Sequence, residues 1–411
     1  MTTPIYSSSF KSKPWYHISF RTIVLVSLPL FSLAGFYGTM ILANGNGTFK
    51  SIISLMESKD PKFPGTEDDL LIRYTNVGWL DRQLTILVTF FAPVVDEKQG
   101  ALSMFARFGT GQFGAAWTLM VMEGMRMGNM GRIVSFVGTF GLIFQNISYT
   151  VTVPIWLFIH LLTSPISKPF SGTHSNSILL ISPLDLRLLP FSVTLSYIVP
   201  TILMALDYPS TVTTLTHQRL IALWQPFPLW TILVHYTLKT TLSTLSSSSN
   251  TTKNNTTSRL QSSPGTTYLK TAKHIYRFTL TICILSHLPI LLLSLLPPTL
   301  IPSTYPSLHT MSQESPLSVY IPPFPSPSSK ISSLAEGVHT FLIWDVYIGS
   351  FAFLLWGMLM YRNAVREKVA WMGLLGKVGV WCVLGGPIGA LTVLLRERDG
   401  LVMGEKVKKG E

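Results

Sequence analysis

Charged residues are scarce in this chain, and their scarcity limits the kind of protein it can be. Asp, Glu, Lys and Arg make up 12% of the 411 residues, whereas hydrophobic residues make up 47%. Soluble domains carry about twice that charged fraction. The composition therefore excludes an ordinary soluble globule and predicts an all-α protein that crosses a membrane several times, with the lipid bilayer as its solvent.

Cysteine is almost absent as well. Cys283 and Cys382 both lie in apolar segments, and no spacing pairs them with another ligand-type residue. Two isolated cysteines supply neither a disulfide framework nor a metal site. We expect both to be small core residues.

The sequence also lacks the motifs of several enzyme classes. It contains no Walker loop, no serine nucleophile elbow and no pair of histidines four residues apart that could hold zinc. Gly109-Thr-Gly111-Gln-Phe-Gly114 matches the spacing of a dinucleotide fingerprint, but it opens an apolar run and follows no strand. Close packing of helices is the favoured interpretation of these glycines.

Clustered acidic residues are missing too. An aspartate-rich magnesium site for a prenyl diphosphate needs several hard oxygen ligands. The closest approach is Glu67-Asp68-Asp69, which has no second acidic cluster and lies among opposite charges. We interpret it as a solvated loop, and predict neither a metal nor a cofactor.

Basic residues outnumber acidic ones, and the formal net charge is +12. The basic residues lie in short loops and tails, as the positive-inside rule expects, and form no stripe with an aromatic platform. Nucleic acid binding is therefore not expected.

Nine apolar runs predict a polytopic transmembrane helical bundle of eight or nine helices. They cover residues 23–42, 84–95 with flanks, 103–122, 133–162, 189–205, 227–238 with flanks, 278–295, 341–360 and 378–395. The first run is too long for a signal peptide and lacks a small-residue cleavage site, so we expect a retained anchor. We thus predict one transmembrane domain, residues 23–395, between a cytosolic tail, 1–22, and a basic tail, 396–411.

Two connectors within this domain are predicted to be irregular. Residues 240–267 are almost all Ser, Thr and Asn, which predicts a disordered loop. Residues 297–333 are rich in Pro and Ser, which predicts a second loop.

Loop charges predict the orientation. A cytosolic amino terminus places the sequon Asn46-Gly-Thr48 in the lumen, where it could be glycosylated. The ending Lys408-Lys409-Gly410-Glu411 has the form of a dilysine endoplasmic-reticulum retrieval signal, which is read from the cytosol. Either one predicted span is re-entrant, or the ending is a chance match. The expected location is the endoplasmic-reticulum membrane.

Polar residues occur at helical spacing inside one of the most apolar stretches. Glu123, Arg126, Asn129 and Arg132 are three residues apart and share one drifting helix face. Ionisable groups at membrane depth usually mark a functional site, although Glu123 and Arg126 could instead mark where the helix leaves the bilayer. Arg126 is expected to hold Glu123 ionised, as a base or an orienting group.

Two other acids have different surroundings. Asp345, in Phe341-Leu-Ile-Trp344-Asp345-Val-Tyr347, has no basic neighbour in sequence, so burial favours its protonated form, as a proton donor requires. Asp81 adjoins Arg82 at a predicted helix start, where it could be a cap or a catalytic group. Nearby aromatic rings could shield a carbocation, or could simply face lipid. A lone acid in an aromatic, apolar chamber suits cyclisation of an isoprenoid that begins with protonation.

Five segments together carry a family resemblance. They are Asn76-Val-Gly-Trp79-Leu80-Asp81, Phe90-Phe91-Ala-Pro93-Val-Val-Asp96, Trp117 with Glu123-Gly-Met-Arg126-Met-Gly-Asn129, Pro154 with His160-Leu-Leu-Thr163-Ser164-Pro165, and Ala222-Leu-Trp224-Gln225-Pro226-Phe227-Pro228. They resemble the fungal membrane-bound terpene cyclases of the ascofuranone and ascochlorin pathways, over about residues 76–230 and again near Asp345. The resemblance implies a metal-independent cyclase, of isomerase or lyase type, that protonates the terminal epoxide of a farnesylated polyketide or phenol.

The resemblance and the aromatic residues together give a set of site residues. The expected catalytic residues are Asp345, Glu123 and Asp81, and the expected substrate-binding residues are Arg126, Asn129, Trp117, His160, Trp224, Gln225 and Trp344. Asp345, or failing that Glu123, would protonate the epoxide. Glu123 or Asp81 would then remove a proton, or a substrate oxygen would close the ring. Arg126 and Asn129 would orient the oxygenated head group.

The expected partners follow from the same resemblance. They are the lipophilic prenylated polyketide or phenol epoxide, the bilayer, and an associated membrane epoxidase or prenyltransferase. Two other functions fit the same sequence. A transporter exporting a metabolite would also place charges along a polar pathway, although the chain shows no two-halved internal symmetry. A non-catalytic scaffold for a biosynthetic complex is the third hypothesis.

Overall fold

The computed structural model describes residues 19–96, 98–170, 174–249, 264–365 and 369–408. Within these ranges the regular structure is helical, and the only β pairing is an isolated bridge between Lys62 and Asp69. The predicted all-α fold is confirmed.

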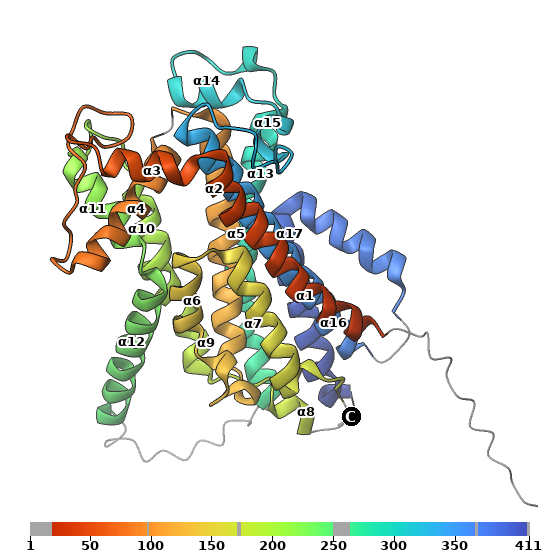
Figure 1. The fold of residues 1–411 in the computed structure, drawn as a ribbon. Helices are drawn as coiled ribbons and strands as arrows, with labels where there is room; N and C mark the ends of the chain where they lie inside the picture. Colours follow the sequence, from red (N-terminus) through yellow and green to blue (C-terminus); the bar gives the residue numbers. More distant parts are fainter. Residues whose placement is uncertain (1–18, 97, 171–173, 250–263, 366–368, 409–411) are drawn as a thin grey trace, which may run out of the picture.

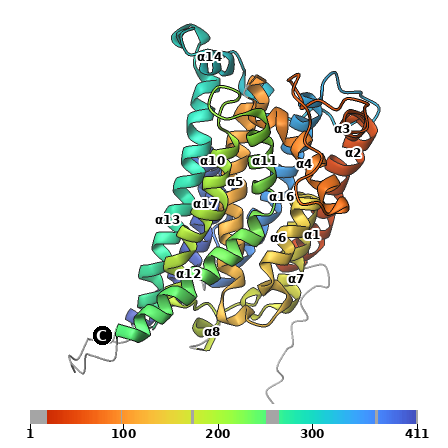
Figure 2. The ribbon, with the colours of Figure 1, turned by 90° about the vertical axis from the view of Figure 1, so that its left-hand side faces the viewer.

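Long helices form a bundle, and short ones cap its ends (Figures 1 and 2). The longer elements are α1 (Phe20–Phe36), η1 (Tyr37–Ile41), α2 (Leu42–Asn46), α3 (Thr48–Met56), α4 (Gly78–Val95), α5 (Gly100–Gly124), α6 (Val137–Asn146), α7 (Tyr149–Thr163), α9 (Pro183–Val193), η5 (Thr194–Ile198), α10 (Val199–Met204), α11 (Thr214–Trp224), α12 (Phe227–Ser249), α13 (Pro264–Leu295), α16 (Leu334–Ala364) and α17 (Trp371–Lys408). The short ones are η2 (Met127–Asn129), η3 (Ile133–Ser135), η4 (Pro165–Ser167), α8 (His174–Ser177), η7 (Pro298–Leu300), α14 (Pro306–Ser312) and α15 (Pro316–Tyr320).

Helix α5 is the centre of the bundle, and almost all of its residues are buried. Its glycines let neighbouring helices approach closely. A Cβ at Gly111 would lie 2.2 Å from the Cβ of Ser286 on α13, and one at Gly114 would lie 2.4 Å from the Tyr197 ring on η5. These contacts confirm that the glycine motif serves helix packing.

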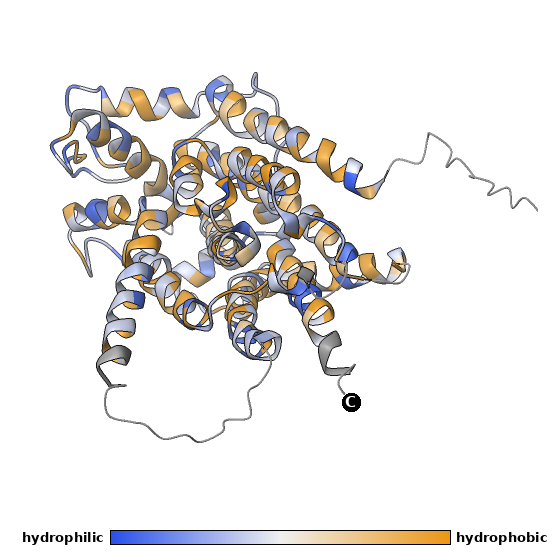
Figure 3. Ribbon diagram, turned by 90° about the horizontal axis from the view of Figure 1, so that it is seen from below, coloured by the Kyte–Doolittle hydropathy of each residue, from blue (hydrophilic) through white to orange (hydrophobic). Residues whose placement is uncertain are grey.

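Five helical segments are long and apolar enough to cross a membrane. They are Phe20–Asn46, Pro183–Met204, Pro264–Leu295, Leu334–Ala364 and Trp371–Gly404. Large hydrophobic side chains are exposed on the outer helices, among them Leu33 on α1 and Leu285 on α13, and the view from below shows the helices end on, coloured by hydropathy (Figure 3). These features are compatible with the predicted membrane bundle, since side chains that face lipid are apolar.

The apolar run 133–162 does not form the single span predicted for it. It folds into the hairpin of α6 and α7, whose ten and fifteen residues reach only about 15 and 23 Å, less than the thickness of the hydrocarbon core. The polar residues between the two helices cause the break, and Ser148 Oγ caps α7 by accepting from Val151 N at 3.3 Å. We call residues 145–150 the hairpin tip.

Helix α17 is also interrupted. Gly385 and Gly386 leave helical geometry, and Gly386 has a φ of +70°, which glycine adopts readily. The Gln112 side chain replaces the broken helical bonds, with Nε2 donating to Gly385 O at 2.9 Å and Oε1 accepting from Ile388 N at 3.0 Å. The helix bends there, so the run 378–395 is not a straight span (Figure 1). A re-entrant span is one of the two explanations given for the dilysine-like ending, and both the hairpin and this bend are candidates for it.

The predicted basic tail, 396–411, is instead largely the end of α17. Arg398 and Asp399 within it have no exposed surface. The expectation failed because it considered the charges of this segment only as solvated groups, whereas opposite charges that pair can be buried.

The predicted connectors also contain helix. Residues 240–249 extend α12, and hydroxyl groups there bond to carbonyls one turn back, as Thr244 Oγ1 does to Thr240 O at 3.1 Å. Residues 250–263 lie outside the described ranges. The segment 297–333 carries η7, α14 and α15, each with proline in its first turn.

The amino-terminal predictions can be followed only in part. Of the tail 1–22, residues 1–18 lie outside the described ranges, and α1 begins at Phe20. The sequon residue Asn46 is buried, and its Oδ1 accepts from Thr48 N at 3.0 Å. A buried amide is a poor glycosylation acceptor.

Candidate functional site

Four of the predicted site residues meet in a buried polar cluster where α5 ends. The cluster consists of Glu123, Arg126, Asn129, His160, Tyr268, Tyr276, Arg398 and Asp399. These residues come from α5, η2 and the turn before it, α7, α13 and α17. The cluster therefore joins four long elements at one end of the bundle.

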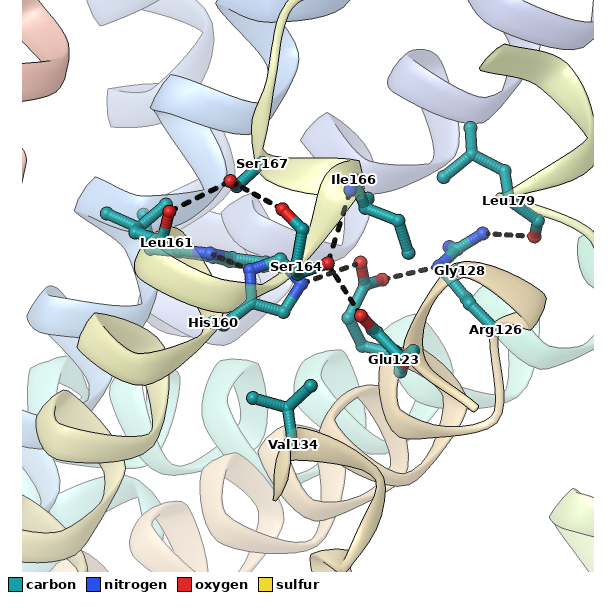
Figure 4. A network of polar contacts seen from close by, with 12 residues as sticks. Glu123, Arg126, Gly128, Val134, His160, Leu161, Ser164, Ile166, Ser167 and Leu179 are labelled. Carbon is teal, nitrogen blue, oxygen red and sulfur yellow. Dashed lines mark hydrogen bonds and ion pairs between the residues drawn. The ribbon is translucent and has the colours of Figure 1, made fainter. Parts of the chain in front are cut away.

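Glu123 is the acid at its centre (Figure 4). Its Oε2 accepts from Arg126 Nε at 2.6 Å and from Arg398 Nη2 at 3.1 Å. His160 Nε2 lies 3.6 Å from the other oxygen, Oε1. The expected pairing of Glu123 with Arg126 is confirmed, but the second arginine was not anticipated.

Asp399 is the second acid of the cluster. It accepts from Arg126 Nη2 at 3.0 Å and from Arg398 Nε at 2.9 Å. The Tyr276 hydroxyl donates to it at 2.6 Å, and the Tyr268 hydroxyl also donates to it. Two carboxylates and two guanidinium groups thus balance each other away from solvent, as buried charges must.

Neutral groups complete the cluster. Trp356 Nε1 donates to His160 Nδ1 at 3.3 Å, which puts the proton of a neutral imidazole on Nε2, facing Glu123. Asn129 Nδ2 donates to the Glu123 carbonyl at 2.8 Å, and its Oδ1 accepts from Ser164 Oγ at 2.6 Å. The amide therefore fixes the turn after α5 against the end of α7.

Arg398 and Asp399 are the functional-site candidates that the sequence prediction missed. Their signal was present in Arg396-Glu397-Arg398-Asp399, where both signs of charge alternate directly after an apolar run. Alternating charges at the end of a membrane helix point to pairing, whereas a solvated tail would need only one sign.

A cavity of about 260 Å³ lies elsewhere in the bundle, close to the size of sites that hold small organic molecules, about 300 Å³ and above. Its walls come from η1, α3, α4, α5, the end of α6, the hairpin tip, η5, α11 and α16. Of the predicted site residues, Asp345 and Trp224 line it. Asp345 is the single acid among the described lining residues.

Asp345 is held by a hydrogen bond from the hairpin tip. Its Oδ1 accepts from Thr150 N in the first turn of α7 at 2.9 Å, and the residue is 9% exposed. None of the ion pairs between described residues includes it. Because Oδ1 is an acceptor, a proton on this carboxyl group belongs on Oδ2.

Aromatic rings surround the cavity in an unbroken series. We call this the aromatic belt, and it runs through Phe49, Phe341, Phe90, Phe91, Trp224, Tyr197, Phe113 and Tyr149. Successive ring centroids are 5.0 to 6.4 Å apart. Near one end, Phe341 precedes Asp345 by one turn of α16, and at the other end Tyr149 adjoins Thr150. The belt therefore begins and ends beside the acid.

The other predicted aromatic and amide residues lie outside the cavity wall. Trp117 stands behind Phe144, with ring centroids 5.8 Å apart, and its Nε1 donates to Thr231 Oγ1 at 3.0 Å. Gln225 contributes its carbonyl, which accepts from Gln145 Nε2 at 2.9 Å. Trp344 packs closely against Gly38 of η1, where an added Cβ would lie 3.2 Å from the Trp344 side chain.

Asp81 also lies outside the cavity wall, at the start of α4. Its Oδ1 accepts from Tyr74 N at 3.0 Å, from Thr75 N at 2.7 Å and from Thr75 Oγ1 at 2.9 Å. Burial raises the pKa of Asp81, but these hydrogen bonds outweigh it, so the pKa lies below its ordinary value. The carboxylate therefore organises the turn before α4, whereas the helix cap considered for it is not formed, because Val77 is the N-cap residue and no side chain caps it.

The site residues do not form a metal centre. Among the described residues, no three His, Cys, Asp or Glu side chains come together in a way that could hold a metal ion.

Comparison with known proteins identifies the family. The CtvD domain matches residues 23–403. This chain belongs to the CtvD domain family. The predicted resemblance to fungal terpene cyclases is therefore confirmed, and no solved structure matches the chain.

Proteins of similar sequence match along most of the chain. Terpene cyclase ascI of Acremonium egyptiacum is 30% identical over 82% of this chain and 83% of its own length. Terpene cyclase ctvD of Aspergillus terreus is 28% identical over 86% and 94%. Terpene cyclase penA of Penicillium crustosum is 28% identical over 90% and 94%.

The CtvD match includes both the cavity and the polar cluster. It ends at residue 403, beyond Arg398 and Asp399. Residues 396–403 of the segment predicted as a tail are thus part of the family domain.

Proposed function

We propose that this protein is a membrane-bound terpene cyclase that acts on an epoxyfarnesyl group attached to a polyketide or phenol. Asp345 protonates the epoxide inside the aromatic cavity. The observation that carries this proposal is the position of Asp345, which lies in the cavity wall between the two ends of the aromatic belt and has no basic partner among the described residues. The names of the relatives support the class of reaction.

The chemistry follows from that position. The proton on Oδ2 passes to the epoxide oxygen as a carbon–oxygen bond opens, so positive charge develops on the substrate carbon. Rings of the aromatic belt face this charge and stabilise it, while the apolar lining keeps water away. A double bond or an oxygen of the substrate then closes the ring. The Asp345 carboxylate takes up the proton that is released, and the product has the mass of the substrate.

An acid rather than a diphosphate-bound metal starts the reaction in this proposal. Magnesium held against a diphosphate needs several oxygen ligands, usually carboxylates. The described lining residues supply one carboxylate, and the rest of the wall is mainly aromatic and aliphatic. Such a wall suits a neutral, lipophilic substrate.

The membrane has a direct role in this proposal. An epoxyfarnesyl compound partitions into lipid, and five helical segments of the chain are suited to the bilayer. We propose residence in the endoplasmic-reticulum membrane, in association with the epoxidase or prenyltransferase that supplies the substrate.

A microsomal assay tests the reaction. Membranes from yeast expressing the chain are incubated with an epoxyfarnesyl phenol, with and without a chelator, and products are followed by mass spectrometry. We expect an isomer of unchanged mass that forms equally with chelator. Loss of conversion with chelator would overturn the metal-free reaction. No conversion of several such epoxides by correctly folded protein would overturn the cyclase assignment and favour transport or scaffolding.

A further inference from the structure

The hairpin tip lies halfway along the bundle, where membrane proteins rarely break their helices. Phe144 packs on Phe113, the midpoint of α5, with ring centroids 5.1 Å apart. Ser32 Oγ of α1 donates to Val151 O at 2.9 Å, and Asp345 of α16 accepts from Thr150 N. The tip therefore contacts the interior of three long segments, Phe20–Asn46, α5 and α16, and not their ends (Figure 1).

The tip is rich in hydrogen-bond acceptors that have no donor. Gln145 Nε2 donates to the Gln225 carbonyl oxygen, and Asn146 Nδ2 donates to Leu142 O at 2.7 Å. The side-chain oxygens of both residues accept no hydrogen bond from any described residue. Within the described chain, the carbonyls of Phe144, Gln145 and Asn146 are also without a donor.

Such a concentration of free acceptors requires a partner. Broken helices are tolerated at bilayer depth where they line a cavity, and transporters use their ends to bind substrate. The last turn of α6 also carries the partial negative charge of a helix carboxyl end. Both effects favour a group that donates hydrogen bonds.

The cavity supplies the space for that group. Gln145 and Asn146 both line it, as do Ile147 and Ser148 of the tip. Asn146 and Ile147 are exposed, so the cavity opens at the tip.

We propose that Gln145 and Asn146 determine specificity by binding a free hydroxyl group of the substrate through Oε1 and Oδ1. The proposal rests on the proposed function for the identity of the reacting substrate. Because Asp345 is bonded to the same tip, the hydroxyl group is held close to the acid while the prenyl chain folds against the aromatic belt. A methyl ether in place of the hydroxyl group cannot donate and is rejected.

The wall of α4 provides a matched control. Gln83 also lines the cavity, and its amide forms no hydrogen bond with the described residues. It lies on a continuous helix, away from the hairpin tip. Asn146→Leu and Gln83→Leu remove the same type of group from two different walls at nearly constant side-chain size.

Equilibrium binding to the purified full chain tests the proposal without requiring turnover. The probes are a farnesylated phenol that lacks the epoxide and its O-methyl ether. We expect the wild type to bind the phenol roughly tenfold more tightly than the ether, the range of one or two hydrogen bonds. Asn146→Leu and Gln145→Leu should bring the ratio close to one, while Gln83→Leu should leave it unchanged. Thermal unfolding identifies any variant that has not folded.

Two results would overturn the subsite. One is equal affinity of the wild type for both probes. The other is loss of the preference in Gln83→Leu while the tip variants keep it. These outcomes are distinct from failure of the proposed reaction, since the probes lack the epoxide. If the chain binds the probes with the expected preference but converts no epoxide, the proposal of a hydroxyl subsite is kept and the proposal of a cyclase is rejected.

Discussion

The polar cluster and the cavity share α5, α7 and neighbouring helices, yet their buried acids have opposite surroundings. On α7, Thr150 binds Asp345 and His160 faces Glu123, ten residues and about 15 Å apart along the helix. In the cluster, Glu123 is surrounded by Arg126 and Arg398, and Asp399 by the same two arginines. In the cavity, Asp345 accepts from the backbone N–H of Thr150 and lines an open space.

The contrast separates two uses of a buried acid. A carboxylate paired on all sides holds helices in place, because moving any partner leaves an uncompensated charge. A carboxyl group without a basic partner can carry and release a proton. Burial alone therefore does not distinguish the two acids; the proposal that Asp345 is the proton donor depends on its position beside a cavity without a counter-charge.

Replacing Asp345 gives the largest expected effect. In Asp345→Asn, the new amide oxygen still accepts from Thr150 N, so the fold remains, but the group cannot donate an acidic proton. We expect turnover to fall by about 10² to 10⁴, the range for loss of a general acid. Product formation in microsomes measures it. Asp207→Asn, an exposed acid outside the cavity wall, is the control and should keep wild-type turnover.

An Asp345→Asn variant that folds normally and keeps full turnover would place the proton donor elsewhere. Glu123 would then be the next candidate, and the separation between the two regions would break down.

The corresponding change in the cluster should affect stability instead. Glu123→Gln leaves Arg126 and Arg398 with one fewer buried anion, at an expected cost of about 3 to 5 kcal/mol in the free energy of unfolding. Thermal or denaturant unfolding in detergent measures it. Turnover per folded molecule should change little, because Glu123 does not line the cavity. The double variant Glu123→Gln, Arg398→Met restores the charge balance and should recover part of the loss.

If Glu123→Gln instead keeps its stability and loses turnover, the cluster has a catalytic role after all.

An aromatic change tests the cavity without touching its acid. Phe91 lies in the belt between Phe90 and Trp224, with ring centroids 5.2 and 5.3 Å away. Phe91→Leu keeps an apolar wall but removes a π face worth about 0.5 to 2 kcal/mol to a nearby cation. We expect turnover to fall between about twofold and thirtyfold. Phe353→Leu, a buried ring outside the cavity wall, should lower stability and leave turnover per folded molecule unchanged.

Much of this arrangement was predictable from sequence, because the informative residues lie close together in the chain. Glu123, Arg126 and Asn129 are three residues apart, so helical spacing alone grouped them. Asp345 was recognised from its apolar neighbours and the lack of a nearby base. Apolar runs located the bundle, since each run must bury itself in lipid or protein.

The errors concern contacts between distant segments and breaks within apolar runs. Nothing near Glu123 in sequence shows that Arg398, 275 residues away, completes its pairing. The break between α6 and α7 was not predicted, because a hydropathy window averages the few polar residues at the hairpin tip with their apolar neighbours. The sequence therefore placed Arg126 with the substrate head group, whereas the structure ties it to Asp399.

The smallest expected effect concerns α11, whose Trp224 lines the cavity, and it depends on pH. His217 on α11, the helix that also carries Trp224, is buried beside Tyr208, with ring centroids 4.1 Å apart. Burial lowers the pKa of His217 to about 4, against an ordinary value of about 6.5. The unfolded chain therefore gains a proton as the pH falls below about 6.5, while the folded chain stays neutral until about pH 4. Stability contributed by His217 is present above pH 6.5 and declines between these values. The protection factors of α11 amides, which remove the intrinsic pH dependence of hydrogen exchange, should fall from pH 7.5 to pH 5, and His217→Gln should remove this change. The same fall in the variant would show that another group is responsible.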